Sequence, residues 1–214
     1  MSYYPMNVKL QGRCCAVIGG GNVAERKTLS LLAAGAKVTV VSPALTEKLA
    51  GLARAGHITW IAREYTAGDV QNCFVVICAT GDPAVNSQAA KEAREGGSLV
   101  NVADNPGLSD FHVPSAITRG DLMLTVSTAG KSPAMARRLK EELGGRYGPE
   151  YGRYLEIVAK VRREMKEQLP TSQDREQFWR DTFDENVLTL LRLGKMDEAE
   201  ERIQNAVSST GIKP

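Results

Sequence analysis

Short apolar runs alternate with longer segments of helical periodicity along the first half of the chain. The runs with the length and composition of buried strands are residues 16–18, 37–41, 58–61, 73–79 and 99–102. The segments with helical spacing, each followed by glycine, are residues 24–34, 46–55 and 83–95. Residues 6–10 are expected to pair at a sheet edge, and residues 11–13 to turn into the first strand. This alternation predicts an α/β fold with a doubly wound parallel sheet.

The regular alternation ends after Phe111. We expect one more strand at 121–127, a helix at 134–143, and a break made by Gly144-Gly145 and Gly148-Pro149. Further helices are expected at residues 151–168, 175–181, 186–193 and 196–207. Charged residues of both signs are denser in this part, which is typical of solvated helix faces. We therefore divide the chain into residues 1–113, 114–148 and 149–214.

The first strand runs directly into glycines, in the sequence CCAVIGGGNVAER of residues 14–26. The spacing Gly19-x-Gly21-x-x-Ala24 matches the dinucleotide fingerprint, whose small residues allow a tight turn and a close approach of pyrophosphate. The following helix offers N–H groups and a positive dipole end to phosphates. A glycine-rich turn without a ligand is the alternative. The expected cofactor-binding residues of this Rossmann-type sheet are Gly19, Gly20, Gly21, Asn22 and Val23.

Ser42 stands near the position where an acid usually binds the ribose 2′-hydroxyl, about 20 residues after the glycines. Serine can hydrogen-bond a hydroxyl, but it does not repel a 2′-phosphate as a carboxylate does. The residues therefore favour NAD over NADP only mildly.

Ligands of open parallel sheets bind beyond the carboxyl ends of the strands. The cofactor-binding candidates at these ends are Ser42, Pro43, Thr80 and Asp82. Asp104 follows the last strand and is the catalytic candidate, although Asp-Asn-Pro-Gly is also good turn chemistry. His112 lies eight residues further on and is a candidate for the same cleft, against simple packing or exposure. His57 is expected at the surface.

The loop of residues 127–133 precedes the helix expected at 134–143. Hydroxyls and N–H groups at a helix N-terminus can hold an anion. The alternative is an ordinary helix cap, with Ser132 as N-cap and Pro133 at the first helical position. The substrate-binding candidates here are Ser127, Thr128, Lys131, Ser132 and Arg137.

Composition narrows the functional classes. The chain has 214 residues and a net charge of +2, so no strong field favours nucleic acid or a membrane surface. It has no apolar run near the length of a membrane span, and no signal peptide is evident. None of the four cysteines has the spacing of a metal site, so we expect no bound metal and buried thiols in a reducing cytoplasm.

Four segments together resemble the precorrin-2 dehydrogenase/sirohydrochlorin ferrochelatase family, the NAD-dependent part of siroheme synthase. They are VIGGGNVAERK (17–27), VVICATGDPAVN (75–86), LVNVADNPGLSDFHVPS (99–115) and TVSTAGKSPAMARRLKEEL (125–143). The first segment is common among nucleotide binders, whereas the order and separation of the other three are far more specific. The resemblance covers nearly the whole chain and is weakest after Gly144. The methyltransferase domain that follows in long siroheme synthases is not expected in these 214 residues.

The resemblance implies that NAD+ takes a hydride from precorrin-2, with loss of a proton, to give sirohydrochlorin. Bifunctional members then insert Fe²⁺ to give siroheme. It implies that Asp104 is a general base for both steps and that residues 19–23 bind the phosphates. It also places the substrate-facing loop on 127–132, with Thr128 where serine is frequent. The family is dimeric, and the resemblance places the dimer segment at about 114–143.

Two alternatives stay open at this point. One is a dehydrogenase that does not insert iron, because the motifs do not separate it from the bifunctional form. The other is a non-catalytic nucleotide-sensing module, as in ligand-binding domains of ion channels. Such modules usually have an acid at the end of the second strand, where this chain has Ser42, and they have no need of Asp104 together with the 125–143 segment.

Overall fold

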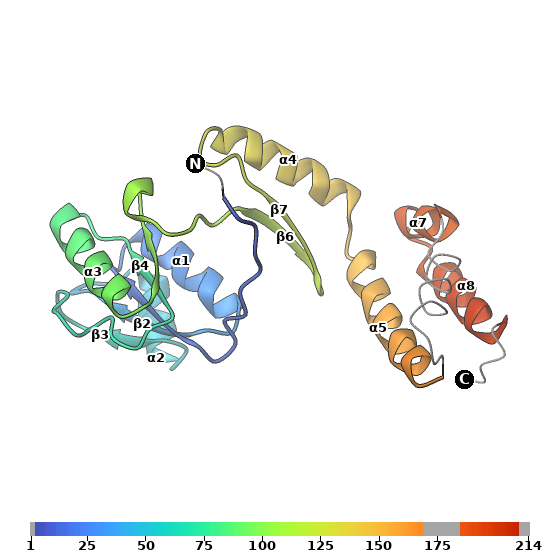
Figure 1. Ribbon diagram of the computed structural model, residues 1–214, viewed down its shortest axis with the longest axis horizontal. Helices are drawn as coiled ribbons and strands as arrows, with labels where there is room; N and C mark the ends of the chain where they lie inside the picture. The colour runs from blue at the N-terminus through green and yellow to red at the C-terminus, as the bar shows by residue number, and fades with distance from the viewer. Residues whose placement is uncertain (1–2, 169–184, 210–214) are drawn as a thin grey trace. The chain divides into compact units, whose positions relative to one another are not determined.

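The chain folds into two compact units, Met1–Val113 and Pro114–Pro214, called the first and second units below (Figure 1). The structure is a computed structural model that describes residues 3–168 and 185–209. The helix expected at 175–181 lies outside the described residues.

The first unit contains a five-stranded parallel sheet in the order β3-β2-β1-β4-β5. Its strands are β1 (Cys14–Ile18), β2 (Lys37–Val41), β3 (Thr59–Ile61), β4 (Val75–Cys78) and β5 (Leu99–Val102). Its helices are α1 (Asn22–Ala33), α2 (Glu47–Arg54) and α3 (Pro83–Glu95). The chain proceeds outward from β1 to β3 and then restarts beside β1 with β4, so the strand order reverses between β1 and β4. The predicted doubly wound sheet is confirmed, and its reversal point is where ligands of such sheets bind.

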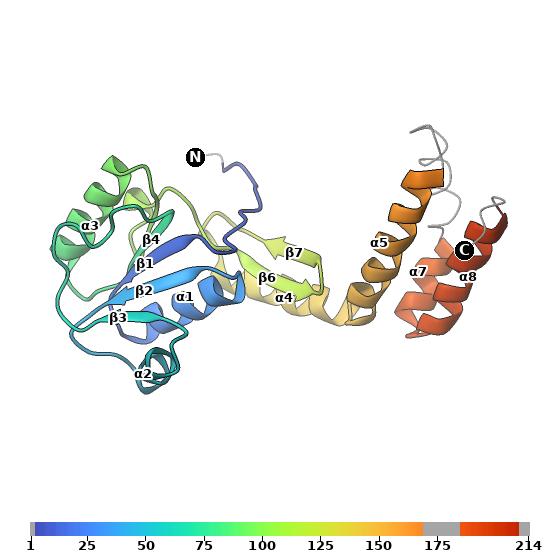
Figure 2. The ribbon, with the colours of Figure 1, turned by 90° about the horizontal axis from the view of Figure 1, so that it is seen from below.

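Each face of this sheet has its own apolar core. Val17 and Ile77 pack on the face that α1 and α2 cover. Ile18 and Val76, the neighbours of these residues along the strands, pack on the face that α3 covers. Figure 2 shows α3 on one side of the sheet and α1 and α2 on the other. Burial on both faces explains why the strands read as continuous apolar runs rather than as alternating ones.

The expectation of edge pairing at residues 6–10 is wrong, because these residues form no strand. Leu10 packs instead against the core on the α1 side of the sheet. The turn that follows occurs as predicted: Gly12 has a φ of 72° and donates its N–H to the carbonyl of Gly35 at 2.8 Å. The lead-in meets the sheet at β1, which already has β2 and β4 as neighbours, so no free edge is available there.

In the second unit, β6 (Ser115–Arg119) and β7 (Leu122–Val126) form an antiparallel hairpin of their own. The sequence pattern predicted β7 but missed β6. In β6 only Ile117 is buried, so its sequence shows hardly any apolar alternation. The tight turn between the strands contains Gly120, with a φ of 55°.

The break predicted at Gly144-Gly145 is wrong, because α4 (Pro133–Arg146) continues through both glycines. Arg119 of the hairpin explains this. Its guanidinium donates to the carbonyl of Gly144 at 3.4 Å and to that of Tyr147 at 3.2 Å, which satisfies carbonyls at the end of the helix. The chain breaks only at Gly148-Pro149.

Within the described residues, the second unit also contains the helices α5 (Glu150–Gln168), α7 (Glu185–Arg192) and α8 (Met196–Ser209). They share an apolar core that includes Tyr154, Leu191 and Ile203. Near its N-terminus, α5 approaches the hairpin turn backbone to backbone. A Cβ on Gly152 would lie 2.8 Å from the carbonyl carbon of Arg119 and 2.9 Å from the nitrogen of Gly120. Glycine at 152 is therefore what lets α5 pack on the hairpin.

We predict that Gly152→Ala lowers the free energy of unfolding of the second unit by about 1–3 kcal/mol, the usual cost of overpacking against rigid neighbours. Gly145→Ala is the matched control, because a Cβ there meets no described atom within 4 Å. It should be neutral or stabilise α4 by up to about 1 kcal/mol. Thermal unfolding followed by circular dichroism measures both. Equal melting temperatures for the two variants would contradict the close contact at Gly152.

Candidate cofactor site and active site

Gly19 and Gly20 are required by the protein itself, whatever binds to them. Gly19 has a φ of 119°, and a Cβ on it would lie 2.4 Å from the carbonyl oxygen of Ala79 at the end of β4. A Cβ on Gly20 would lie 2.0 Å from the carbonyl oxygen of Ala44, in the loop after β2. The turn after β1 is thus pressed between the segments that follow its two neighbouring strands.

Gly21 is different, because a Cβ built on it meets no atom of the described chain within 4 Å. It is the N-cap residue of α1, and no side-chain hydrogen bond caps this helix. The N–H groups of the first turn are therefore available to an anion, beside the positive end of the helix dipole. Ala24 is fully buried against the sheet. These features fit a dinucleotide: pyrophosphate can occupy the space at Gly21, with Asn22 and Val23 beside it.

At the end of β2, Ser42 is buried and belongs to the loop rather than to an open surface. Its hydroxyl donates to the carbonyl of Ala44 at 2.8 Å, and its carbonyl accepts from the indole N–H of Trp60 at 2.9 Å. Pro43 is exposed next to it. The hydroxyl of Ser42 therefore already has a hydrogen-bond partner within the loop.

At the end of β4, Thr80 and Asp82 shape the loop that leads into α3. The Thr80 hydroxyl donates to the amide oxygen of Asn86 at 2.8 Å, and the Thr80 N–H donates to the same oxygen at 3.1 Å. Asp82 caps α3 by accepting from the N–H of Ala84 at 2.8 Å. Sequence reasoning missed Asn86, a buried polar residue whose place in an otherwise apolar helix face was the available signal.

Asp104 lies two residues beyond β5, at the same edge of the sheet as the glycine turn. It is exposed and has a φ of 60°, a left-handed conformation that aspartate tolerates better than most residues. Its side chain makes no hydrogen bond within the described residues. Asn105 caps the 3₁₀ turn η1 (Pro106–Leu108) and accepts the N–H of Leu108 at 3.2 Å. The turn interpretation and the catalytic interpretation are thus compatible: Asn105 makes the turn and Asp104 is left free.

Lys27, on the second turn of α1, is the charged neighbour of Asp104 that sequence reasoning missed. Burial lowers the pKa of its ammonium and Arg26 lowers it further, whereas the carboxylate of Asp104 raises it. Lys27 makes no ion pair shorter than 4.0 Å in the described part of the chain. Its signal in the sequence was a lysine on the half-buried side of a helix.

His112 pairs with the N-terminal segment. Its Nε2 lies 2.7 Å from the Tyr3 hydroxyl, and the two rings meet edge to face with centroids 4.8 Å apart. The preceding carbonyl, of Phe111, accepts from the buried amide of Asn101 at 3.0 Å. A contact between His112 and substrate stays a prediction.

The loop of residues 127–133 belongs to the second unit, and hydrogen bonds of its own hydroxyl groups fix its conformation. Thr128 donates to the carbonyl of Ser132 and accepts its N–H, both at 3.1 Å. Ser132 caps α4 by accepting the N–H of Met135 at 3.2 Å, and Ser127 accepts the N–H of Ala129 at 3.3 Å. The cap interpretation is therefore correct for Ser132, and Lys131 is exposed at the loop. Arg137 pairs with Glu141 along the helix at 3.1 Å.

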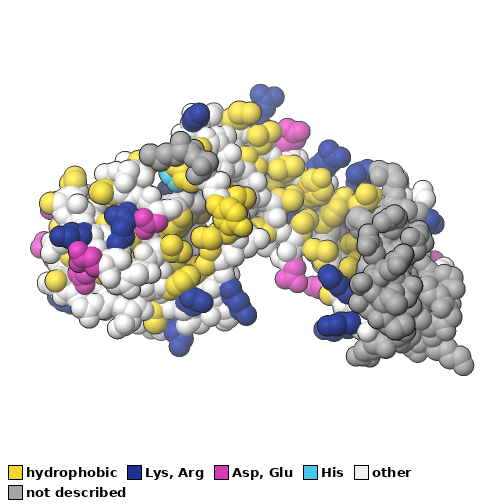
Figure 3. Space-filling model, in the orientation of Figure 1, with side chains coloured by type: hydrophobic (Ala, Val, Ile, Leu, Met, Phe, Trp, Pro, Cys, Tyr) yellow, Lys and Arg dark blue, Asp and Glu magenta, His cyan; other side chains and the backbone are white. Residues whose placement is uncertain are grey.

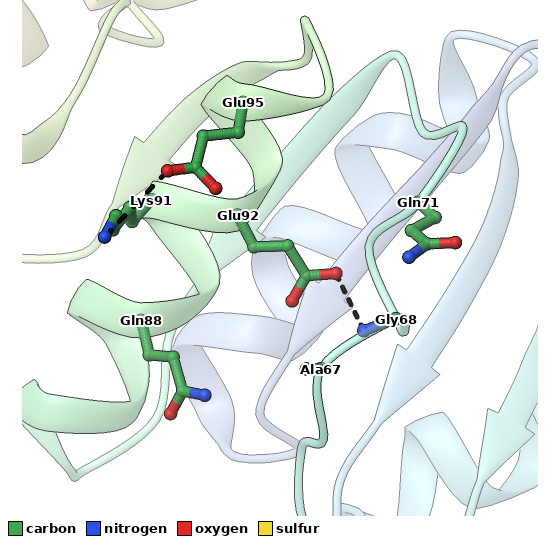
Figure 4. A pocket seen from close by; sticks show the side chains of 7 residues that line it. All are labelled: Ala67, Gly68, Gln71, Gln88, Lys91, Glu92 and Glu95. Carbon is green, nitrogen blue, oxygen red and sulfur yellow. Dashed lines mark hydrogen bonds and ion pairs between the residues drawn. The ribbon is translucent and has the colours of Figure 1, made fainter.

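An open pocket of about 440 Å³ lies elsewhere in the first unit, between α3 and the loop after β3 (Figure 4). In it, Glu92 accepts the N–H of Gly68 at 2.7 Å and the hydroxyl of Tyr65. Burial, with the Glu92 carboxylate as a second cause, raises the pKa of the Tyr65 phenol. The pocket contains neither a residue of the glycine turn nor Asp104, so it is separate from the site described above.

The four cysteines are free thiols. Burial raises the pKa of Cys73 to about 11 and that of Cys78 to about 12, so both are neutral thiols and poor metal ligands. The expectation of buried thiols is wrong for Cys14, which is exposed at the start of β1 because its side chain lies outside the core. Over the two described stretches, no group of three His, Cys, Asp or Glu side chains could hold a metal ion. No helix of the described residues is long and apolar enough to cross a membrane.

Comparison with known proteins gives three adjoining matches. A family described as putative NAD(P)-binding matches residues 6–115, which confirms the predicted dinucleotide cofactor. The central region of a sirohaem biosynthesis protein matches residues 119–146, and the dimerisation region of sirohaem synthase matches residues 150–207. This dimerisation region lies after the segment at 114–143 that the resemblance assigned to the dimer.

Individual proteins are also similar to this chain. A siroheme synthase from Photorhabdus laumondii is 33% identical over 213 residues, which are 100% of this chain and 45% of that protein. Siroheme synthase 1 from Klebsiella pneumoniae is 37% identical over 205 residues, or 96% of this chain and 44% of that protein. The chain thus spans less than half of these relatives. A solved structure, SirC, precorrin-2 dehydrogenase, matches with a TM-score of 0.75 and 27% identity, covering 95% of this chain and all of that one.

The open space at Gly21 gives a direct test of the cofactor site. We predict that Gly21→Asp abolishes binding of NAD+, because the new carboxylate would occupy and repel the position of the pyrophosphate. The fold should be unaffected, since the site has room and aspartate is a favoured N-cap residue. Gly51→Asp, at another open glycine on α2, is the control and should bind NAD+ as the parent does. Calorimetric titration with NAD+ measures this, and unchanged affinity in Gly21→Asp would refute the assignment.

Proposed function

The chain belongs to a family described as putative NAD(P)-binding and is similar to siroheme synthases and to a precorrin-2 dehydrogenase, and we therefore propose that it oxidises precorrin-2 to sirohydrochlorin with NAD+. In this reaction a hydride passes to the nicotinamide and a proton is released. One feature of the structure gives the main support for this proposal. An open dinucleotide turn after β1 and a free carboxylate after β5 lie at one edge of the same parallel sheet, with only β4 between the two strands.

Different residues of the chain bind the cofactor and accept the proton. When bound, the dinucleotide supplies the hydride acceptor. The first turn of α1 holds its pyrophosphate, because uncapped N–H groups and the helix dipole meet at Gly21. Asp104 accepts the proton, since its carboxylate is exposed at the strand ends and makes no hydrogen bond to a side chain among the described residues. Its backbone, held in the left-handed region, keeps the carboxylate at this edge.

Cationic and hydroxyl side chains of the second unit would bind the carboxylates of the substrate. A tetrapyrrole such as precorrin-2 presents several carboxylates, and Lys131 is exposed in the loop that the resemblance assigns to substrate. Ser127 and Thr128 are held there by hydrogen bonds within the loop, so their positions are set before substrate binds. Arg137, which pairs with Glu141 on the exposed side of α4, is a further carboxylate partner.

Insertion of Fe²⁺ into the product is the second activity that the resemblance implies, with Fe²⁺ as a substrate. Asp104 would again accept protons, here from the pyrrole nitrogens. Purified protein, sirohydrochlorin and Fe²⁺, compared with the spontaneous rate, separate a bifunctional enzyme from a dehydrogenase alone.

A homodimer built by the second unit is the assembly that we propose. In the hairpin only Ile117 is buried, and in α4 only Ala136. Met123 and Met135 are 52% and 56% exposed. Figure 3 shows apolar side chains gathered along α4. A surface of this kind is typical of one that another chain covers, and the match to a dimerisation region at 150–207 supports a second copy as the partner.

We predict that Asp104→Asn lowers the turnover of precorrin-2 by about 10²–10⁴-fold, the usual effect of removing a general base. Asparagine tolerates the left-handed backbone at this position, so the loop should keep its shape. Asp104→Ala should lose a similar factor, while both variants bind NAD+ as tightly as the parent. Turnover is measured by absorbance under saturating NAD+. Activity within threefold of the parent would show that Asp104 is only a turn residue.

We predict a mass of twice the 23.2 kDa of one chain in light scattering at micromolar concentration. Met123→Glu should shift the protein toward the monomer, because it places a charge on the exposed face of the hairpin. Val8→Glu, an exposed apolar position in the first unit, is the control and should leave the dimer intact. A parent protein that is monomeric at this concentration would contradict the assembly.

A further inference from the structure

The site lacks the usual means of choosing NAD+ over NADP+. In dinucleotide folds an acid at the end of the second strand binds the 2′-hydroxyl and repels the 2′-phosphate. Here that position is Ser42, whose hydroxyl is buried and donates to the carbonyl of Ala44 at 2.8 Å. If the site discriminates between the two nucleotides, another group must supply the negative charge.

Glu25, on the first turn of α1, reaches the loop that follows β2. Its carboxylate oxygen Oε2 accepts the hydroxyl of Thr46 at 2.6 Å. The N–H of the same threonine donates to the carbonyl of Gly20 at 3.0 Å. These two hydrogen bonds hold the loop against the glycine turn, where the carbonyl of Ala44 leaves no space for a Cβ on Gly20. The carboxylate of Glu25 is thereby fixed between the phosphate-binding turn and the loop that borders the ribose.

The charge of Glu25 lies at the start of α2. Thr46 is the N-cap of this helix and accepts the N–H of Leu49 at 3.3 Å. A helix N-terminus normally attracts phosphate. Here Glu25 bonds the cap residue and Glu47 occupies the first turn, so two carboxylates oppose that attraction. Lys48 is the cation of the same turn, and its side chain is exposed to solvent.

We propose that Glu25 determines the preference for NAD+ over NADP+, by fixing the loop through Thr46 and by placing a negative charge where a 2′-phosphate would bind. Its carboxylate thus replaces the missing acid at the end of β2, from a neighbouring helix rather than from the strand. The proposal rests on the dinucleotide site of the proposed function but not on the reaction with precorrin-2.

Glu25→Gln tests the charge alone, because the amide oxygen can still accept the hydroxyl of Thr46. We expect NADP+ to bind about tenfold more tightly than to the parent, while the affinity for NAD+ stays within twofold. Glu95→Gln removes the same charge at the end of α3, beside the amino ends of the strands, and should change neither affinity. Calorimetric dissociation constants for both nucleotides, at low and high salt, measure this. The preference of the parent for NAD+ should weaken with salt.

Thr46→Val separates positioning from charge. It removes the hydrogen bond to Glu25 and the cap of α2 but keeps the carboxylate, so both nucleotides should bind more weakly. An unchanged ratio of the NAD+ and NADP+ dissociation constants in Glu25→Gln overturns the proposal, as does a parent that binds both equally. A protein that binds neither nucleotide overturns the dinucleotide site itself. Failure to oxidise precorrin-2 with these affinities as expected overturns only the proposed reaction.

Discussion

The turn after β1 leaves no room for a side chain at Gly19 or Gly20, and much of the first unit depends on this close backbone contact. On one side the turn touches the end of β4 at Ala79, and on the other it touches the loop after β2 at Ala44. Three strand ends are therefore drawn together at the point where the strand order reverses. Gly21, in contrast, lies at the surface, and a Cβ on it would meet no atom of the described chain within 4 Å. Packing thus decides which of the three glycines has room for a ligand.

The site around this turn combines rigid and free groups. Thr80, Asp82 and Thr46 already make hydrogen bonds to caps and loops, which fixes the backbone but leaves these side chains little capacity for a ligand. The N–H groups at the start of α1 and the carboxylate of Asp104 are different, because no side chain of the described residues occupies them. Catalytic and binding groups of a preorganised site are expected to show this contrast, since a group already satisfied gains little from a substrate.

The second unit follows another principle. Its helices α5, α7 and α8 have a core of their own, whereas the hairpin and α4 bury few side chains. Arg119 holds this part together locally by binding carbonyls at the end of α4, and Gly152 lets α5 approach the hairpin turn. An apolar surface that remains exposed after such packing is what a second chain would cover. The second unit is therefore the part through which we propose that two copies of the chain assemble.

The sequence by itself determined the sheet, the glycine turn and the place of Asp104. Continuous apolar runs, small residues at fixed spacing and glycines after helices are local signals, and each arises from burial or backbone geometry near the residue concerned. Only the tertiary structure decided the rest, because the partners are distant in sequence. β6 has one buried residue and needed β7 to define it, and α4 passes Gly144-Gly145 because Arg119 binds its last carbonyls. The folded chain also brings Lys27 near the carboxylate of Asp104, and it brings Glu25 into a hydrogen bond with Thr46, 21 positions away. Periodicity reports which side of an element is buried, whereas contacts between elements depend on how the finished elements pack.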